Sequence, residues 1–462
     1  MTASVAAGLS GDSGWILTAA TLVVAGLLLA PGWIVGRSAR LAALPSLAVA
    51  PALSSAIIAA AEILAHTLAL PWLPWGWAVI AGLTAVVALM ARLLVGAPPE
   101  RARRAASQGR AEWVILAAGL TVAVAVPAGV ILTVLPGPGY PAQVFDATFH
   151  LNAVAAIREG GNASMLGGLS ALYSGRAVYY PTVWHGLVAL APGSPAPVST
   201  AGVLALTAVV WPLSLLGLLA RATGLDAARA SETDRARRRQ RACAVAAVLA
   251  LSAAVVGFPL LPMTALAVWP YALSVAGLPG VLVLYDLLRQ ETASWRLRLV
   301  LVLLALAAAG GVVAAHGTGL FNLAVLSPPF LVNLLVSRWR RSATRRGGRA
   351  LLAAGAVASV LVLAVGAWVM RASLASVLGY QRPAGGVGGI VATLGQALID
   401  LPMYGAVPGA SLPVGIVFGG LTLAAAWSAR AHRDQRPWLV MWLLSLLLVV
   451  LVGGPQWAGR QL

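Results

Sequence analysis

The sequence predicts an all-α, polytopic integral membrane protein with about twelve transmembrane helices and with outer-face loops that carry short surface helices. Two observations carry the membrane assignment. Hydrophobic residues occupy 60% of the 462 positions and the mean hydropathy is +0.89. Apolar runs of about 20 residues, the length at which a helix crosses a bilayer, recur along the chain. The charged residues, 10% of the total, fall mostly in short clusters between these runs.

The predicted spans are apolar runs bounded by arginine clusters, and they make one transmembrane domain over residues 1–462. The N-terminal tail carries Asp12 and no basic residue, so it lacks the positive region of a cleaved signal peptide, and we expect the first run to remain as a span. Ser327-Pro328-Pro329 breaks the ninth span. The ranges are 15–36, 43–65, 72–95, 113–135, 199–220, 243–260, 270–288, 299–315, 317–337, 350–370, 411–428 and 437–454.

Arginines set the predicted orientation. All 31 basic residues are Arg, and 26 of them fall in alternate connections between spans. Positive residues accumulate on the cytoplasmic side, so those connections are predicted to be cytoplasmic and both termini to face out, in a plasma (inner) membrane. The formal charge of +18 therefore reflects orientation and lipid-headgroup contact, and we exclude nucleic acid as a partner. The single cysteine, Cys243, excludes an intramolecular disulfide. The absence of Lys and the abundance of Ala and Gly suggest a GC-rich bacterial genome.

Polar residues gather on the predicted outer side. The two long outward connections run over residues 136–198 and 371–410, and the first of them is the candidate active-site loop. Ionisable groups at membrane depth are expensive and usually face a bundle interior or an aqueous cavity. We therefore expect a cavity open to the outer face. The histidines on or near that side are His66, His150, His185 and His316.

The segment 143–159 predicts a short helix at the membrane surface that stops at Gly160-Gly161. Asp146 and His150 share one face of this helix at spacing i, i+4. Three roles fit the pair. Asp146 is a general base while His150 orients a phosphate, the two residues ligate a divalent cation such as Mg²⁺ or Mn²⁺, or they satisfy each other as an ion pair. Glu62 and His66 repeat the spacing inside a span, where an interhelical hydrogen-bonding pair is favoured.

The candidate ligand-binding residues follow the same loop. Tyr179, Tyr180 and Trp184 fit either an aromatic belt at the membrane interface or a wall that stacks on a sugar or clamps an isoprenoid chain. His185 lies beside them. His316 precedes Gly317, where backbone can approach an anion closely, although a helix-end cap fits equally well. Arg371 and Arg382, with Arg158 and Arg176, are outward cations suited to a phosphate or pyrophosphate.

The order of these features carries a resemblance. An Asp-x-x-Phe-His segment that opens an outer loop, a Gly-Gly stop and a Tyr-Tyr-Pro-x-x-Trp-His segment resemble the alanine- and leucine-rich polytopic membrane proteins of actinobacteria, which are themselves similar to GT-C glycosyltransferases. The motifs cover about 45 residues. The resemblance implies transfer of a sugar from a polyprenyl-phosphate donor to a cell-envelope glycan or lipid acceptor at the outer face. Asp146 matches the outer-loop acid that is the catalytic base or metal-associated acid of that class.

Two departures from the GT-C pattern accompany this match. The acid usually follows the first span, whereas Asp146 follows about the fourth, and related proteins are expected to continue into a further C-terminal outer portion. The expected mechanism is inverting transfer with Asp146 as the base. His150, His185 and an outer arginine are expected to hold the departing polyprenyl phosphate. Trp184 and Tyr180 are expected to frame the sugar. No nucleotide-sugar site is visible on the cytoplasmic side.

Two other functions fit the same pattern. A lipid-linked glycan ligase also uses about a dozen spans and outer Arg and His residues to hold a pyrophosphate, but depends less on an acid. A transporter or flippase of envelope precursors is the non-enzymatic alternative, and it predicts inverted repeats and polar residues at mid-span, neither of which stands out here.

Overall fold

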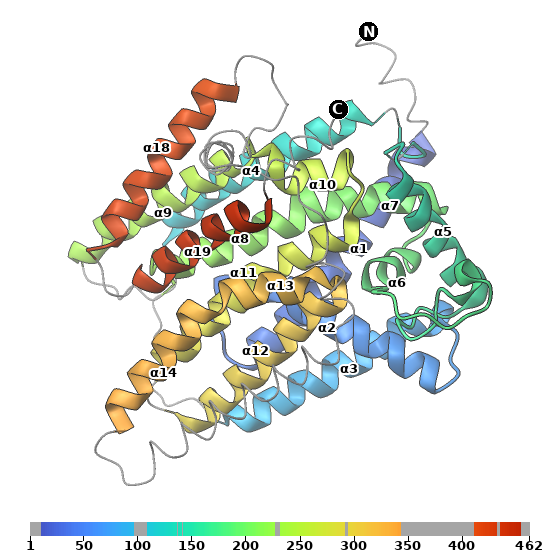
Figure 1. Cartoon of the computed structure of the whole chain (residues 1–462), viewed down its shortest axis with the longest axis horizontal. Helices are drawn as coiled ribbons and strands as arrows, with labels where there is room; N and C mark the ends of the chain where they lie inside the picture. The colour runs from blue at the N-terminus through green and yellow to red at the C-terminus, as the bar shows by residue number, and fades with distance from the viewer. Residues whose placement is uncertain are drawn as a thin grey trace. The chain divides into compact units, whose positions relative to one another are not determined.

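The computed structural model describes residues 11–96, 109–135, 137–140, 142–226, 232–291, 294–342, 411–431 and 435–453, and the regular structure in these ranges is helical (Figure 1). The chain divides into two compact units. The first comprises residues 1–323 and 402–406, and the second comprises residues 324–401 and 407–462. The predicted outer connection 371–410, with Arg371 and Arg382, lies outside the described residues.

Seven described helices are long and apolar enough to cross a membrane, and the number rises to nine if each of two bent pairs is one span. A membrane-embedded protein follows, whereas twelve crossings are not established. The seven are α1 (Gly11–Ser38), α2 (Ala43–Thr67), α3 (Trp72–Val95), α4 (Arg110–Val134), the run Pro195–Ala222 that joins α7 (Pro195–Leu204), η4 (Ala205–Val210) and α8 (Trp211–Ala222), then α11 (Trp269–Gln290) and α12 (Trp295–Ala315).

Bends divide two of the predicted spans. The range 243–260 belongs to α9 (Glu232–Ser252), η5 (Val256–Leu260) and α10 (Leu261–Thr264), which bend by 51°. In the range 317–337, α13 (Thr318–Leu326) and α14 (Pro328–Ser342) bend by 45° at the predicted break. Helices α18 (Ser411–Ala429) and α19 (Arg436–Gly453) cover the last two predicted ranges, and the range 350–370 lies outside the described residues.

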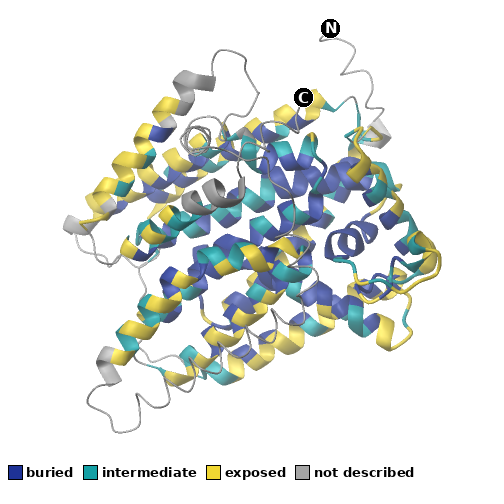
Figure 2. Ribbon diagram, viewed as in Figure 1, coloured by how far each residue is buried: buried dark blue, intermediate teal, exposed yellow. Residues whose placement is uncertain are grey.

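Helix α2 is central to the first unit, where it packs against α1, α3, α8, α11 and α12. Small residues permit this packing. A Cβ added at Gly280 would lie 2.6 Å from the Ala48 carbonyl oxygen, and one added at Gly311 would collide with the Ala52 carbonyl oxygen. In the most apolar stretch of α2, 72% of the residues are buried, whereas the corresponding share in α3 is 22% (Figure 2). Helix α3 therefore exposes an apolar face of the kind that lipid covers.

The two ends of α11 have different partners. At its N-terminal end, Trp269 contacts His150. At its C-terminal end, Asp286 makes ion pairs with Arg221 at 2.7 Å and with Arg289 at 2.7 Å. A helix of 22 residues spans about 30 Å at 1.5 Å per residue, so the ion pairs and the histidine lie roughly a bilayer core apart. Arg221, which the sequence suggested as an orientation signal, thus also joins α8 to α11, whereas Arg289 pairs with Asp286 within α11.

The candidate active-site loop folds into α5 (Phe145–Gly160), η3 (Ser170–Tyr173) and α6 (Val183–Ala189). Helix α5 confirms a helix over most of the predicted range 143–159, and Gly161 ends it with a φ of 66°, a left-handed conformation that favours glycine. Helices α5 and α6 pack together at one side of the first unit (Figure 1). The loop is therefore an ordered structure placed against the ends of the spans.

Candidate functional site

Helix α6 is the innermost part of the loop. All seven of its residues are buried, including Trp184 and His185 (Figure 2). It packs against α1, α2, α5, α7, α11 and α12, so it lies among span ends rather than over them. Contact of a ligand with Trp184 or His185 therefore requires α6 to move, and their predicted role in binding substrate stays a prediction.

Two histidines from different helices meet at this position. Nδ1 of His150 on α5 lies 2.9 Å from Nε2 of His185 on α6, a hydrogen bond between the two rings. Asp146 was the sequence-based partner for His150, but the described structure has no ion pair between them. Sequence spacing alone gave no signal for the pairing of His150 with His185, because 35 residues separate the two.

Both rings of this histidine pair are held neutral at physiological pH. Burial lowers the pKa of His150 to about 4, and repulsion from the charged form of His316 adds to the effect. Burial, together with repulsion between the two rings, brings the pKa of His185 well below its ordinary value, although the carbonyls of Pro181 and Thr182 act in the opposite direction. The pair is thus unsuited to hold a phosphate as a cation. It can orient α5 and pass a proton between rings.

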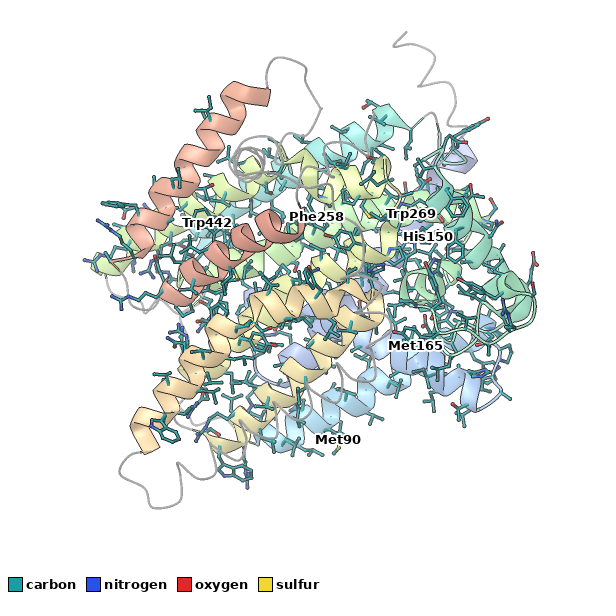
Figure 3. All side chains as sticks on the ribbon, in the orientation of Figure 1. Met90, His150, Met165, Phe258, Trp269 and Trp442 are labelled. Atoms are coloured by element: carbon teal, nitrogen blue, oxygen red, sulfur yellow. The ribbon has the colours of Figure 1, made fainter. Side chains whose placement is uncertain are left out.

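Aromatic rings surround the histidine pair. Trp269 at the start of α11 lies 5.4 Å from the His150 ring and 6.0 Å from the Trp184 ring, between centroids (Figure 3). Phe149 lies 5.1 Å from Tyr180, and Tyr180 lies 5.7 Å from His185. These rings form a continuous aromatic cluster that runs from the buried Trp184 to the half-buried Tyr180. Tyr179 is exposed next to it.

Asp146 is the exposed polar group of the site. It lies in the first turn of α5, and its carboxylate has no hydrogen bond or ion pair within the described residues. Burial raises the pKa of the Tyr180 phenol, and the nearby Tyr173 and Asp146 raise that pKa further by electrostatic repulsion. The carboxylate is therefore open to solvent at the rim of the aromatic cluster, one helical turn before His150.

Side chains of three other helices, Glu62, Trp72 and Arg158, hold α6 in place, and no sequence pattern indicated this role for any of them. Thr182, just before α6, donates a hydrogen bond of 2.9 Å to Glu62 of α2. Trp72 of α3 donates one of 2.8 Å from Nε1 to the Gly186 carbonyl. Arg158 of α5 donates to three carbonyls at and beyond the end of α6, those of Ala189, Ala191 and Gly193.

His316 lies at the border of the site as the C-cap residue of α12. Its Nδ1 lies 2.7 Å from the Thr318 hydroxyl and accepts a hydrogen bond from the Thr318 backbone N–H, as a helix-end cap does. Its ring contacts Tyr271 edge-on at 5.9 Å, and burial lowers its pKa. The structure thus supports the capping alternative locally, while the half-buried ring remains near His150.

The structure places the candidate phosphate-binding arginines and the candidate metal ligands differently from what the sequence led us to expect. Arg158 is committed to backbone carbonyls, whereas Arg176 on the same loop is exposed, and its side chain has no partner among the described residues. Glu62 bonds to Thr182 rather than to His66, which is exposed in an open pocket. Within the described part of the chain no three His, Cys, Asp or Glu side chains gather as metal ligands.

Comparison with known sequences assigns the chain to a family. Residues 25–462 match the family of unknown function designated DUF6541. The chain belongs to DUF6541. No curated protein and no solved structure matches it. The match of this DUF6541 protein includes every residue of the site described above and both compact units, apart from the first 24 residues.

Proposed function

We propose that this DUF6541 protein is a GT-C-type membrane glycosyltransferase that moves a sugar from a polyprenyl-phosphate donor to a cell-envelope glycan or lipid acceptor. The active face is extracytoplasmic, on the loop that carries α5 and α6, in the plasma membrane of an actinobacterium. The observation that carries the proposal is Asp146, an exposed carboxylate without a described partner at the rim of an aromatic cluster.

Asp146 acts as the general base in this mechanism. It takes the proton of an acceptor hydroxyl as the acceptor oxygen bonds to the anomeric carbon of the sugar. The bond from that carbon to the phosphate oxygen breaks, and polyprenyl phosphate leaves with the electron pair. Transfer by this single displacement inverts the anomeric carbon. A positioned base contributes about 10²- to 10⁴-fold to such a step.

The other residues bind and orient. Tyr180 and Phe149 offer aromatic faces to the sugar, because such faces suit the apolar side of a pyranose ring. Arg176 is the described outer cation available for the phosphate, with Arg371 and Arg382 as further candidates. The neutral histidine pair does not clamp the phosphate. It fixes α5, and hence Asp146, against the span ends.

Transfer of radiolabelled sugar from a panel of polyprenyl-phosphate donors, by purified protein in lipid, tests the proposal. Asp146→Asn should lower transfer by about 100-fold or more. Glu159→Gln is the matched control, because Glu159 is an exposed acid on the same helix, three turns away. Full transfer by Asp146→Asn would overturn the assignment of the base. No transfer from any donor by the folded native chain would overturn the function and favour a ligase or a transporter.

A further inference from the structure

We infer that Glu62 is a positioning residue of this site, because it fixes the first turn of α6 and so sets the contact between His185 and His150. The inference deepens the proposed glycosyl transfer and depends on it for its catalytic meaning. Glu62 lies in a membrane span, α2, and the sequence pattern had paired it with His66 instead.

The geometry around Glu62 is specific. Its side chain is buried, with 1% exposure, and its Oε2 accepts the hydrogen bond of 2.9 Å from the hydroxyl of Thr182, which is also fully buried. Its Oε1 is buried without a hydrogen-bond partner among the described residues. A buried carboxyl with one unmet oxygen is costly, and such groups in membrane spans usually serve a function.

Gly186 permits the close approach of Glu62 to α6. A Cβ added at Gly186 would overlap Oε1 of Glu62 and would lie 3.0 Å from its Cδ. Thr182 and Gly186 are four residues apart, so they lie on one face of the first turn of α6, and His185 directly precedes Gly186. The carboxyl group of Glu62 therefore contacts α6 on both sides of His185 along the chain.

The other two tethers hold different parts of α6. Trp72 bonds to the Gly186 carbonyl, and Arg158 bonds to carbonyls from Ala189 onwards. Thr182 is the residue just before the first turn of α6. Among the described side-chain hydrogen bonds that hold α6, only the bond to Glu62 is made by this residue. Removal of this bond should leave α6 attached but free to shift at the end that presents His185. A ring-to-ring hydrogen bond of 2.9 Å does not survive a shift of about 1 Å.

The test reads the histidine pair directly and needs no sugar donor. Protein labelled with ¹⁵N-histidine is placed in lipid nanodiscs, and the ring nitrogen signals of His150 and His185 are assigned with His150→Gln and His185→Gln. Thr182→Val replaces the hydroxyl by a methyl group of similar size, and Glu62→Leu removes the acceptor. Glu62→Gln keeps an acceptor oxygen. Thr67→Val is the matched control, because Thr67 lies on α2 and its hydroxyl bonds only within that helix.

Thr182→Val and Glu62→Leu should each lose the ¹⁵N signature of the hydrogen-bonded pair, whereas Glu62→Gln and Thr67→Val should keep it. Native signals in folded Thr182→Val and Glu62→Leu would overturn the inference. If Glu62→Leu fails to fold, Thr182→Val decides alone. A Thr182→Val chain that does not fold would also overturn it, since the bond would then serve the whole fold rather than the pair.

The transfer assay separates this inference from the proposed function. Thr182→Val should lower transfer by about tenfold or more if the pair orients Asp146, and Glu62→Gln should restore most of what Glu62→Leu loses. A lost signature in the variants, with no transfer by the native chain, would keep the positioning role and reject the glycosyltransferase. A native signature in the variants would reject the positioning role whatever the transfer assay gives.

Discussion

Nδ1 of His150 lies 2.9 Å from Nε2 of His185, and the two residues belong to different helices, α5 and α6. Only one proton lies between two neutral rings that share a hydrogen bond, so each ring fixes the tautomer of the other. The pair thereby links the buried α6 to the helix that carries the exposed Asp146. Changes that disturb this link should be measurable even before a substrate is known.

The first prediction concerns pH. Burial and repulsion from His316 hold the pKa of His150 at about 4, against 6.5 for an ordinary histidine. Between these values the unfolded chain binds a proton that the folded chain does not, so the free energy of unfolding falls as the pH drops from 6.5 to 4. His150 alone accounts for up to about 3 kcal/mol of this loss. Thermal unfolding in detergent across that pH range measures it.

Two variants bracket the pH effect. His150→Gln should flatten the slope between pH 6.5 and pH 4, because it removes one of the two buried rings. Thr67→Val, which changes a side chain at the end of α2 without removing an ionisable group, should leave the slope as it is. An equal slope in the native chain and in His150→Gln would contradict the burial of His150 as its cause.

The second prediction concerns Arg158, whose guanidinium donates to the carbonyls of Ala189, Ala191 and Gly193. Lysine keeps the charge but lacks the fork that reaches three acceptors. Hydrogen bonds to a charged group contribute about 1.5–3 kcal/mol, so Arg158→Lys should speed amide hydrogen exchange at residues 190 and 191 by about tenfold or more. Hydrogen exchange with mass spectrometry measures it.

Arg176→Lys is the control for Arg158. Arg176 is exposed on the same loop and its side chain has no partner in the described part of the chain, so exchange after α6 should not change. Unchanged exchange in both variants would show that the three carbonyl contacts do not hold the end of α6.

The third prediction uses two adjacent glycines on α12. A Cβ at Gly311 would collide with the Ala52 carbonyl of α2, whereas one at Gly310 would meet nothing within 4 Å. Gly311→Ala should therefore lower the free energy of unfolding by about 1–3 kcal/mol through overpacking. Gly310→Ala should be neutral or slightly stabilising, because Ala is the better helix former. Thermal unfolding of the two variants, side by side in detergent, gives the comparison.

Similar loss of stability in both glycine variants would contradict the packing of α12 on α2. If both glycine variants kept the stability of the native chain, the close packing of α12 on α2 would also be contradicted, because only a loose contact accommodates an added methyl group without cost. The pair differs by one position, so helix propensity and depth in the membrane are nearly matched, and the difference isolates the contact with Ala52.

The spans were predictable because a bilayer imposes one rule on every segment that crosses it. Apolar length alone located α2 and α3 almost residue for residue, and Gly160-Gly161 marked the end of α5 because glycine adopts the left-handed conformation there. The 51° bend after α9 was missed, since the apolar run continues through it. Ser327-Pro328 correctly predicted the bend between α13 and α14, because proline interrupts helical hydrogen bonding.

The candidate site was only partly predictable. Sequence patterns selected His150, His185 and Tyr180, which the structure brings together, but gave no sign of Trp269, which lies far from all three along the chain and closes the aromatic cluster. The i, i+4 spacing matched His150 with Asp146 and Glu62 with His66. In the structure His150 meets His185 and Glu62 meets Thr182, because a helix face allows a pairing without requiring it.

By itself the sequence determined the membrane class, most of the helix positions and the loop in which polar groups concentrate, because hydrophobic length and residue type act locally. Only the tertiary structure decided which of those polar groups are buried, which are exposed and which are partners. Burial of α6 depends on the contact of six other helices with it, and no local pattern encodes that contact. Asp146 is left in solvent, whereas His185 is enclosed by the helices that pack around α6.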